Sequence, residues 1–386
     1  MCRAVPQTHR IDTLEGVRGL AAVIVFFYHW ILGFLPQFSG VFSGFPPEQA
    51  MVGRFGFFFI NGPGAVIFFF VLSGFVLSRK VLLTYQPEQI VVAALKRWPR
   101  LAFPTVMACF ISWLFFHYDF YHYQEAAALT HSPWLASFAG AFVGAPPNVY
   151  SLRSALEQGG FLTFFRGDFY YDSSIWTMHY EFVASFMIFG LCLFLLVFRT
   201  LPKWVALLPI FIVMQLSDIV SSLYFPFFIG LLAAYFLPIN LKISPFLRVF
   251  ILAVGLYILG YFSLSGLPIG RFTFQYQYID AVGSVLVFMA CYDVRLTAWP
   301  QRIAQCLGQL SFPFYLLHAL MLCSFGAWLF VLLKTQGWPH PSFLVGFATF
   351  WLSIAVSVPF IKLNSLWMQQ LNRVLLPVTK RLTQIR

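Results

Sequence analysis

Long apolar segments constrain the fold of this chain more than any other feature of its sequence. A helix needs about 20 apolar residues to cross the hydrocarbon core of a bilayer. Only 10% of the 386 residues are charged and 60% are hydrophobic, so a soluble domain could not bury this surface. We therefore expect an all-α integral membrane protein built as a bundle of about ten transmembrane helices. The segments lie near 17–35, 63–83, 101–117, 176–198, 203–217, 221–237, 246–264, 279–293, 309–333 and 342–363.

The basic residues between these segments predict how the chain crosses the membrane. With a cytoplasmic N-terminus, the outside loops hold Arg54, Arg153, Arg166, Arg271 and Lys334, and the other 19 of the 24 Lys and Arg residues lie inside. Such an excess of inside positive charge is typical of membrane proteins. We therefore expect a multi-pass protein with both termini cytoplasmic. The plasma membrane and the endoplasmic reticulum are not distinguished, and the oligomeric state is left open.

The chain is expected to form a single domain over residues 1–386. Its last part, 364–386, is a basic amphipathic stretch that we expect to lie on the cytoplasmic membrane surface. The outside loop 118–175 is long enough to form a lid or a re-entrant piece. The net charge of +11 is spread between apolar segments without a long basic cluster, so nucleic-acid binding is not expected.

Arg18 and His29 flank the first half of the first apolar segment. They are eleven positions apart, about three helical turns, so their side chains share one helix face about 16 Å apart along the axis. Ionisable residues at membrane depth are costly and mark functional sites. The alternative is an arginine at the membrane boundary and a buried histidine bonded to a neighbouring helix.

A second group of cations lies where the third apolar segment begins. Arg97 and Arg100 are three apart and face the same way in a helix, and Lys96 adjoins them. Arginine holds phosphate groups through paired hydrogen bonds, which makes this patch a candidate phosphate site. Positive-inside anchoring alone is the alternative.

Two further segments place polar residues inside the membrane. Glu181 lies a turn or more into the fourth long apolar segment, where a carboxylate must be paired, protonated or facing water. Tyr315 and His318 share a helix face in the ninth. Structural hydrogen bonds to neighbouring helices would also explain these residues.

No metal or nucleotide motif stands out. His117 and His122 with Asp119 resemble a ligand cluster, but their spacing fits no strong metal motif, and the six cysteines show no metal-ligand spacing. The chain has no P-loop, no dinucleotide-binding fingerprint and no GxSxG motif. We expect no metal and no permanently bound cofactor.

Five blocks in this order resemble the membrane acyltransferase 3 family of multi-span O-acyltransferases. They are DTLEGVRGLAAVIVFFYH (12–29), FFFVLSGFVLS (68–78), KRWPRLAFP (96–104), SIWTMHYEF (174–182) and LGQLSFPFYLLH (307–318). Together the blocks extend over nearly the whole chain. The resemblance implies an acyltransferase that transfers groups other than amino-acyl groups, and we expect it to work without the hydrolase-like domain that some relatives append.

The resemblance implies roles for these residues. The donor would be acyl-CoA, with acetyl-CoA favoured, and its phosphates would meet Arg97, Arg100 and Arg18. His29 would be the general base for a hydroxyl of a glycan, glycolipid or small molecule, because its pKa lies near neutrality. Glu181 would fix the tautomer of His29. A covalent acyl-histidine route stays open.

For the acceptor, the resemblance implies that Tyr315 and His318 bind it or stabilise developing charge. The residues alone also allow a proton-coupled secondary transporter of an anionic or acylated solute. Transporters commonly contain two related halves, which this sequence does not show. A catalytically inactive sensor with the same fold is the third alternative.

Overall fold

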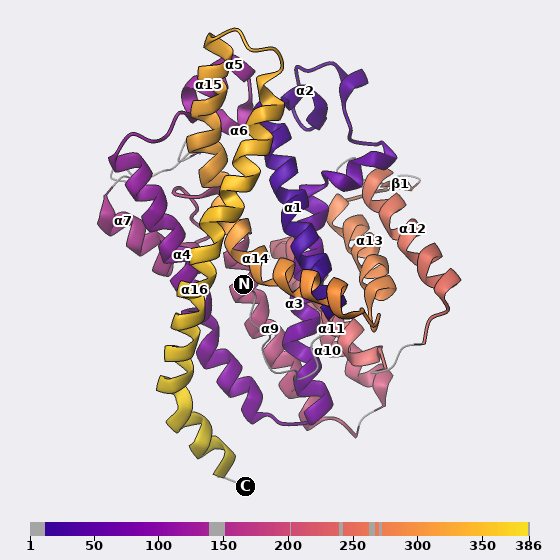
Figure 1. Ribbon diagram of the computed structural model, residues 1–386. Helices are drawn as coiled ribbons and strands as arrows, with labels where there is room; N and C mark the ends of the chain where they lie inside the picture. The colour runs from indigo at the N-terminus through magenta and orange to yellow at the C-terminus, as the bar shows by residue number, and fades with distance from the viewer. Residues whose placement is uncertain are drawn as a thin grey trace.

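The protein is a bundle of long helices that lie roughly side by side (Figure 1). The computed structural model describes residues 12–138, 151–200, 202–238, 242–261, 267–269 and 272–384. The long helices are α1 (Asp12–Phe34), α3 (Gly62–Thr84), α4 (Glu88–His117), α9 (Thr177–Val197), α14 (Ala298–Met321), which continues through the π-helical turn η6 (Leu322–Gly326) into α15 (Ala327–Thr335), and α16 (Pro341–Gln384). The all-α prediction is confirmed; within the described residues the strands are one short antiparallel pair, β1 (Leu267–Ile269) and β2 (Phe272–Phe274).

Shorter helices complete the bundle and its connections. Four are apolar: α10 (Lys203–Val220), α11 (Phe225–Phe236), α12 (Pro245–Tyr261) and α13 (Tyr276–Cys291). The connecting turns are α2 (Pro36–Ser39), η1 (Pro47–Gln49), η2 (Phe55–Phe59), α5 (Tyr123–Thr130), α6 (Pro133–Ala136), α7 (Leu152–Glu157), η3 (Gln158–Leu162), α8 (Thr163–Phe165), η4 (Ser173–Trp176) and η5 (Ser222–Tyr224).

Each of the ten predicted apolar segments coincides with a helix, but the number of spans differs from the prediction. Within the described residues, six helical segments are long and apolar enough to cross a membrane, and α10 to α13 are shorter. The count of ten spans is therefore not confirmed. Several helices also begin earlier than hydropathy predicts. Helix α4 starts at Glu88 rather than 101. Its first turns carry charged residues, which lower the hydropathy there although the backbone is helical.

Helices α1 and α14 approach each other closely along the site. A Cβ atom on Gly19 would lie 2.4 Å from Leu307 Cβ, and one on Gly308 would lie 2.8 Å from Glu15 Cβ. Glycine at both positions therefore lets the two backbones approach, as small residues do between membrane helices. Hydrogen-bonded side-chain pairs between the two helices have residue numbers that increase together, so α1 and α14 run parallel. These pairs are Asp12 with Gln301, Arg18 with Ser311, and His29 with His318.

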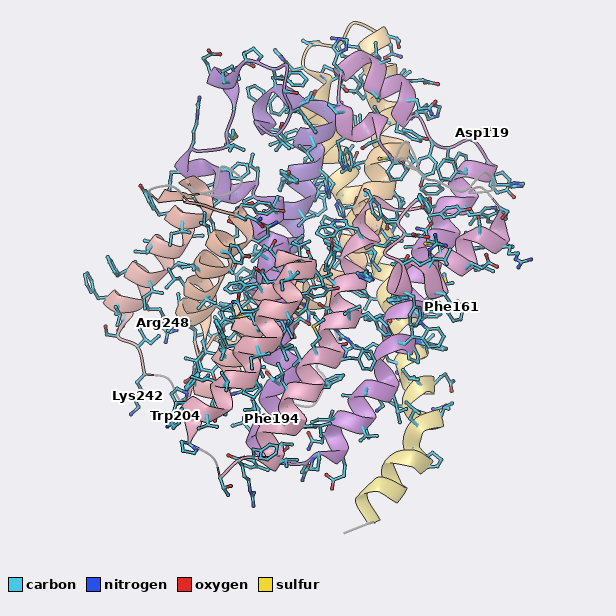
Figure 2. All side chains as sticks on the ribbon, turned by 180° about the vertical axis from the view of Figure 1, so that it is seen from behind. Asp119, Phe161, Phe194, Trp204, Lys242 and Arg248 are labelled. Atoms are coloured by element: carbon cyan, nitrogen blue, oxygen red, sulfur yellow. The ribbon has the colours of Figure 1, made fainter. Side chains whose placement is uncertain are left out.

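The loop 118–175, predicted to lie outside, packs onto the bundle through short helices. Helix α5 lies against α15, and α6 lies against α1. The segment α7–η3 lies beside α4, where Trp98 Nε1 donates a hydrogen bond to the carbonyl oxygen of Gly160 at 2.9 Å, and α8 lies against α9. Residues 139–150 of this loop lie outside the described residues. Asp119, at its start, lies at the opposite end of the molecule from Trp204 and Lys242 (Figure 2).

Helix α16 begins at Pro341, covers the tenth predicted segment, 342–363, and continues without a break into the predicted tail, 364–386. It extends beyond the rest of the bundle at one end (Figure 1). The Trp367 ring stacks on Phe103 with 4.9 Å between ring centroids, and Trp367 Nε1 donates to the carbonyl oxygen of Pro99 at 2.9 Å. The start of the tail therefore packs on α4. Its lying on the membrane surface stays a prediction, and the side chains after 377 lie outside the description.

The close approach of α1 and α14 predicts a specific effect on stability. We expect Gly19→Ala to lower the free energy of unfolding by about 2 kcal/mol, because the new methyl group meets the Leu307 backbone. Gly190→Ala in α9 is the matched control, since nothing lies within 4 Å of its Cβ position. Thermal unfolding in detergent micelles measures both. Equal melting temperatures for the two variants would contradict the assigned role of Gly19.

Candidate active site

The centre of the site is a pair of histidines from helices far apart in the sequence. His29 Nδ1 of α1 lies 2.7 Å from His318 Nε2 of α14. The two ring planes are within 13° of each other. His318 is completely buried, whereas His29 keeps part of its surface accessible. The pair therefore has an inner member enclosed by protein and an outer member with part of its surface exposed.

The partners of His318 determine the hydrogen positions on both rings. His318 Nδ1 lies 2.7 Å from the carbonyl oxygen of Tyr315 and 3.2 Å from that of Phe314. A carbonyl oxygen only accepts hydrogen bonds, so we assign the hydrogen of the neutral His318 ring to Nδ1. His318 Nε2 is then an acceptor, and His29 Nδ1 donates to it. His29 Nε2 is left with a free lone pair, as a general base requires.

Arg18 lies on α1 as the sequence predicts, and it is bound on several sides. Its guanidinium group lies 2.8 Å from the Glu15 carboxylate. It also donates to Ser311 Oγ at 2.9 Å and to the carbonyl oxygen of Gly308 at 2.5 Å. The side chain is still 32% exposed. Arg18 therefore joins α1 to α14 about three helical turns before His29, and part of its guanidinium group stays exposed.

Glu181 has a different partner from the one expected. The family resemblance implied that it would orient His29, but Glu181 Oε1 lies 2.6 Å from Arg97 NH2 and accepts from Ser73 Oγ at 2.5 Å. The full charge of a guanidinium group attracts a carboxylate more strongly than a neutral imidazole does. The partner of His29 is instead His318. Ser73 was not predicted, since a serine in an apolar helix carries no distinguishing pattern.

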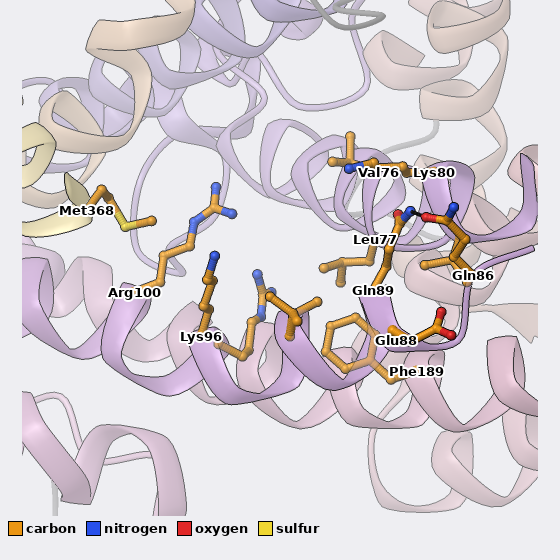
Figure 3. Close-up of a pocket in the computed structure, with 14 residues that line it drawn as sticks. Val76, Leu77, Lys80, Gln86, Glu88, Gln89, Lys96, Arg100, Phe189 and Met368 are labelled. Atoms are coloured by element: carbon orange, nitrogen blue, oxygen red, sulfur yellow. Dashed lines mark hydrogen bonds between the residues drawn. The ribbon is translucent and has the colours of Figure 1, made fainter. Parts of the chain in front are cut away.

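Arg97 is 6% exposed and paired, so the accessible positive charge comes from its neighbours. A pocket of about 430 Å³ between α3 and α4 is lined by Lys80, Lys96, Arg97 and Arg100, with apolar residues such as Leu77 and Phe189. Figure 3 shows Lys96 and Arg100 extending from α4 into this space. The sequence analysis predicted Lys96, Arg97 and Arg100 as a patch but did not single out Lys80.

Electrostatic interactions connect this pocket to α1. Arg100 is exposed, and its charge interacts with those of Arg97, Arg18, Glu181 and Glu15. The structure therefore brings together the three arginines predicted from two distant segments. Three cations with two carboxylates leave a net positive charge, which favours an anionic ligand at this position.

Tyr315 and His318 were predicted to bind the acceptor. The Tyr315 hydroxyl lies 3.1 Å from Thr177 Oγ1, and both residues are buried. Because His318 is fully buried behind His29, its contacts are those of a residue that orients the His29 ring. Direct contact of either residue with an acceptor stays a prediction.

A metal site is not formed by the described residues, among which no three His, Cys, Asp or Glu side chains gather closely enough to hold an ion. His122 Nδ1, from the cluster noted in the sequence, lies 3.3 Å from Glu125 Oε2.

The apolar helices and the polar residues gathered between them define an integral membrane protein with an internal site. Residues 11–361 match the sequence model of the family Acyl_transf_3, described as an acyltransferase domain. The chain belongs to the acyltransferase 3 family, and the predicted resemblance is confirmed over nearly its whole length. It is therefore a membrane acyltransferase. Neither a curated protein nor a solved structure matches it.

The Arg97–Glu181 pair predicts a marked loss of stability when one charge is removed. We expect Glu181→Gln to lower the free energy of unfolding by about 3 kcal/mol, because it leaves a buried guanidinium group without its counter-charge. Glu157→Gln is the matched control. It breaks the exposed Arg153–Glu157 pair, whose side chains are 87% and 51% exposed, and should change stability by less than about 1 kcal/mol.

Thermal unfolding of both variants in the same detergent measures the difference. A Glu181→Gln protein that unfolds at the temperature of the wild type would show that Arg97 does not depend on this carboxylate.

Proposed function

We propose that the protein is an acyl-CoA-dependent O-acyltransferase, in which His29 is the general base. The observation that carries the proposal is the histidine pair. His29 is partly exposed, its Nδ1 is bound to the buried His318, and its Nε2 is unprotonated by our assignment. A histidine with one nitrogen fixed and the other free is the arrangement that general-base catalysis needs.

The reaction follows from this arrangement. His29 Nε2 takes the proton of an acceptor hydroxyl while the hydroxyl oxygen bonds to the thioester carbonyl carbon. The carbon–sulfur bond then breaks, and the departing thiolate takes the proton from His29 Nε2. During the step the positive charge on His29 is stabilised through Nδ1–H by His318, which in turn donates to the Tyr315 carbonyl oxygen. Protons and charge balance without a further reactant.

The cationic pocket supports an acyl-CoA donor. Arg100 and Lys96 line it beside Arg97, and Arg18 lies close enough to interact with Arg100. Phosphate oxygens would bind these exposed cations, whereas Arg97, neutralised by Glu181, would hold the site's shape. Arg18 and His29 lie about 16 Å apart along α1. The slender pantetheine arm of CoA is long enough to bridge that separation and deliver a thioester to His29.

The acceptor is proposed only as a hydroxyl compound: a glycan, a glycolipid or a small molecule. An acetyl donor is favoured by the family resemblance. Both termini are proposed to be cytoplasmic, which would place the donor pocket on the cytoplasmic side and bring the acceptor from the other. Mass spectrometry of lipids, glycans and metabolites from cells with and without the gene would identify the product by one acyl group of added mass.

Removal of the base tests the mechanism. We expect His29→Ala to lower the transfer rate by about 10²- to 10⁴-fold, since general-base catalysis contributes about that factor. His117→Ala is the control, because His117 is exposed at the end of α4. Membranes supplied with labelled acetyl-CoA report the product. Full activity of a folded His29→Ala protein would end the assignment, and solute flux without a labelled product would favour a transporter.

Removal of the accessible cations tests the donor site. We expect Arg100→Ala combined with Lys96→Ala to raise the KM for acyl-CoA about tenfold, with kcat within twofold, because two solvent-accessible cations that together contribute about 1.4 kcal/mol of binding free energy account for a factor of ten. Lys334→Ala, an exposed cation of α15, is the control. An unchanged KM in the double variant would remove these residues from the donor site.

A further inference from the structure

Trp134 lies directly against the histidine that we propose as the base. Its ring is nearly parallel to His29, with 4.9 Å between the ring centroids and 12° between the planes. The His29 ring is in turn within 13° of the His318 plane. Trp134 belongs to α6, in the loop between α4 and α9, and it therefore reaches the site from a part of the chain that the proposed reaction does not use.

The position of Trp134 is fixed by its own short helix. Ser132 Oγ donates to the carbonyl oxygen of Leu32 at 2.6 Å and accepts from the Leu135 amide at 3.1 Å. Ser132 and Leu135 are both buried. The Trp134 ring also lies across Gly33, where an added Cβ atom would be 3.4 Å from it. Gly33 is one helical turn beyond His29, so Trp134 covers two adjacent positions on one face of α1.

A histidine ring needs such external support to keep one orientation. Rotation about the bond to the imidazole ring has broad minima, so the side chain's own rotamer does not fix the ring plane. The hydrogen bond to His318 is directional and weakens steeply when the ring turns away from the line between the nitrogens. A parallel aromatic ring opposes that rotation by contact over its whole face.

We propose that Trp134 is a positioning residue, which holds the His29 ring in the plane that maintains the His29–His318 hydrogen bond and so keeps His29 in one tautomer. This proposal rests on the proposed role of His29 as base. It assigns the α5–α6 part of the loop a place in the reaction, because a residue of α6 sets the orientation of a base carried by α1.

Steady-state kinetics provide the first test. We expect Trp134→Ala to lower kcat at least tenfold while the KM for acyl-CoA stays within twofold, since the donor pocket is not touched. Trp134→Phe keeps an aromatic face and should recover kcat to within about threefold of the wild type. Trp338→Ala is the matched control, because Trp338 is an exposed tryptophan that follows α15. A change in donor KM alone, or no recovery by phenylalanine, would overturn the proposal.

A double-mutant cycle separates positioning from a purely structural role. His318→Phe keeps a ring but removes the acceptor nitrogen. If Trp134 acts by aligning this hydrogen bond, Trp134→Ala should lower kcat by less than twofold in the His318→Phe background. Effects of residues that act independently would add. A full tenfold further loss in that background would show that Trp134 acts by another route.

Nitrogen NMR of the protein with ¹⁵N-labelled histidine tests the proposal without any substrate. The wild type should show His29 with one protonated and one unprotonated ring nitrogen, well separated in chemical shift. In Trp134→Ala the two signals should approach each other as the tautomers exchange. An unchanged separation would overturn the positioning role. An altered separation in a protein that binds no acyl-CoA would support it while showing that the proposed donor is wrong.

Discussion

The close, parallel approach of α1 and α14 is the constraint on which the site depends. Glycines at 19 and 308 remove the side chains that would otherwise hold the backbones apart. Arg18 then reaches the Gly308 carbonyl oxygen, and three turns further along the same face His29 reaches His318. Membrane helices gain little from hydrophobic contact with one another, so packing and interhelical hydrogen bonds must supply the association. Here the bonds that join the helices are also those that shape the site.

The charges inside the bundle are arranged in pairs with unequal exposure. Arg97 is buried against Glu181, whereas Arg18 shares its charge between Glu15 and α14 and stays partly exposed. Arg100 remains open to the pocket. A buried charge needs a counter-charge in a medium of low dielectric constant. The arrangement therefore keeps the scaffold electrically balanced and leaves accessible positive charge where an anion would bind.

Much of this was predictable from the sequence, because hydropathy and helical period depend on local order alone. The positions of the helices follow from the apolar segments, and the common face of Arg18 and His29 follows from 3.6 residues per turn. The partners across helices were less accessible to such reasoning. Glu181 and His318 were both recognised, but which of them meets His29 depends on how helices cross, and no periodicity encodes that. Trp134 was missed because aromatic residues are common throughout this chain.

The span count shows a second limit. Helices α10 to α13 coincide with predicted apolar segments, yet within the described residues their apolar stretches run for 10–17 residues, short of the about 20 that a spanning helix typically has. Hydropathy measures where a segment is apolar, whereas its helical length depends on the turns, prolines and hairpin that bound it. In α4 the helix is instead longer than the apolar segment, because its charged first turns are helical although their hydropathy predicts a loop.

The sequence separation of the two histidines has a consequence for biogenesis. The paired rings are 289 residues apart, so the first is threaded into the membrane long before the second has been synthesised. Throughout that interval His29 lacks its partner His318, and Arg18 has Glu15 of its own helix but not yet its partners on α14. Under the proposed mechanism, the nascent protein is therefore inactive until its last quarter has been inserted, and completion of the bundle and onset of catalytic competence become a single event.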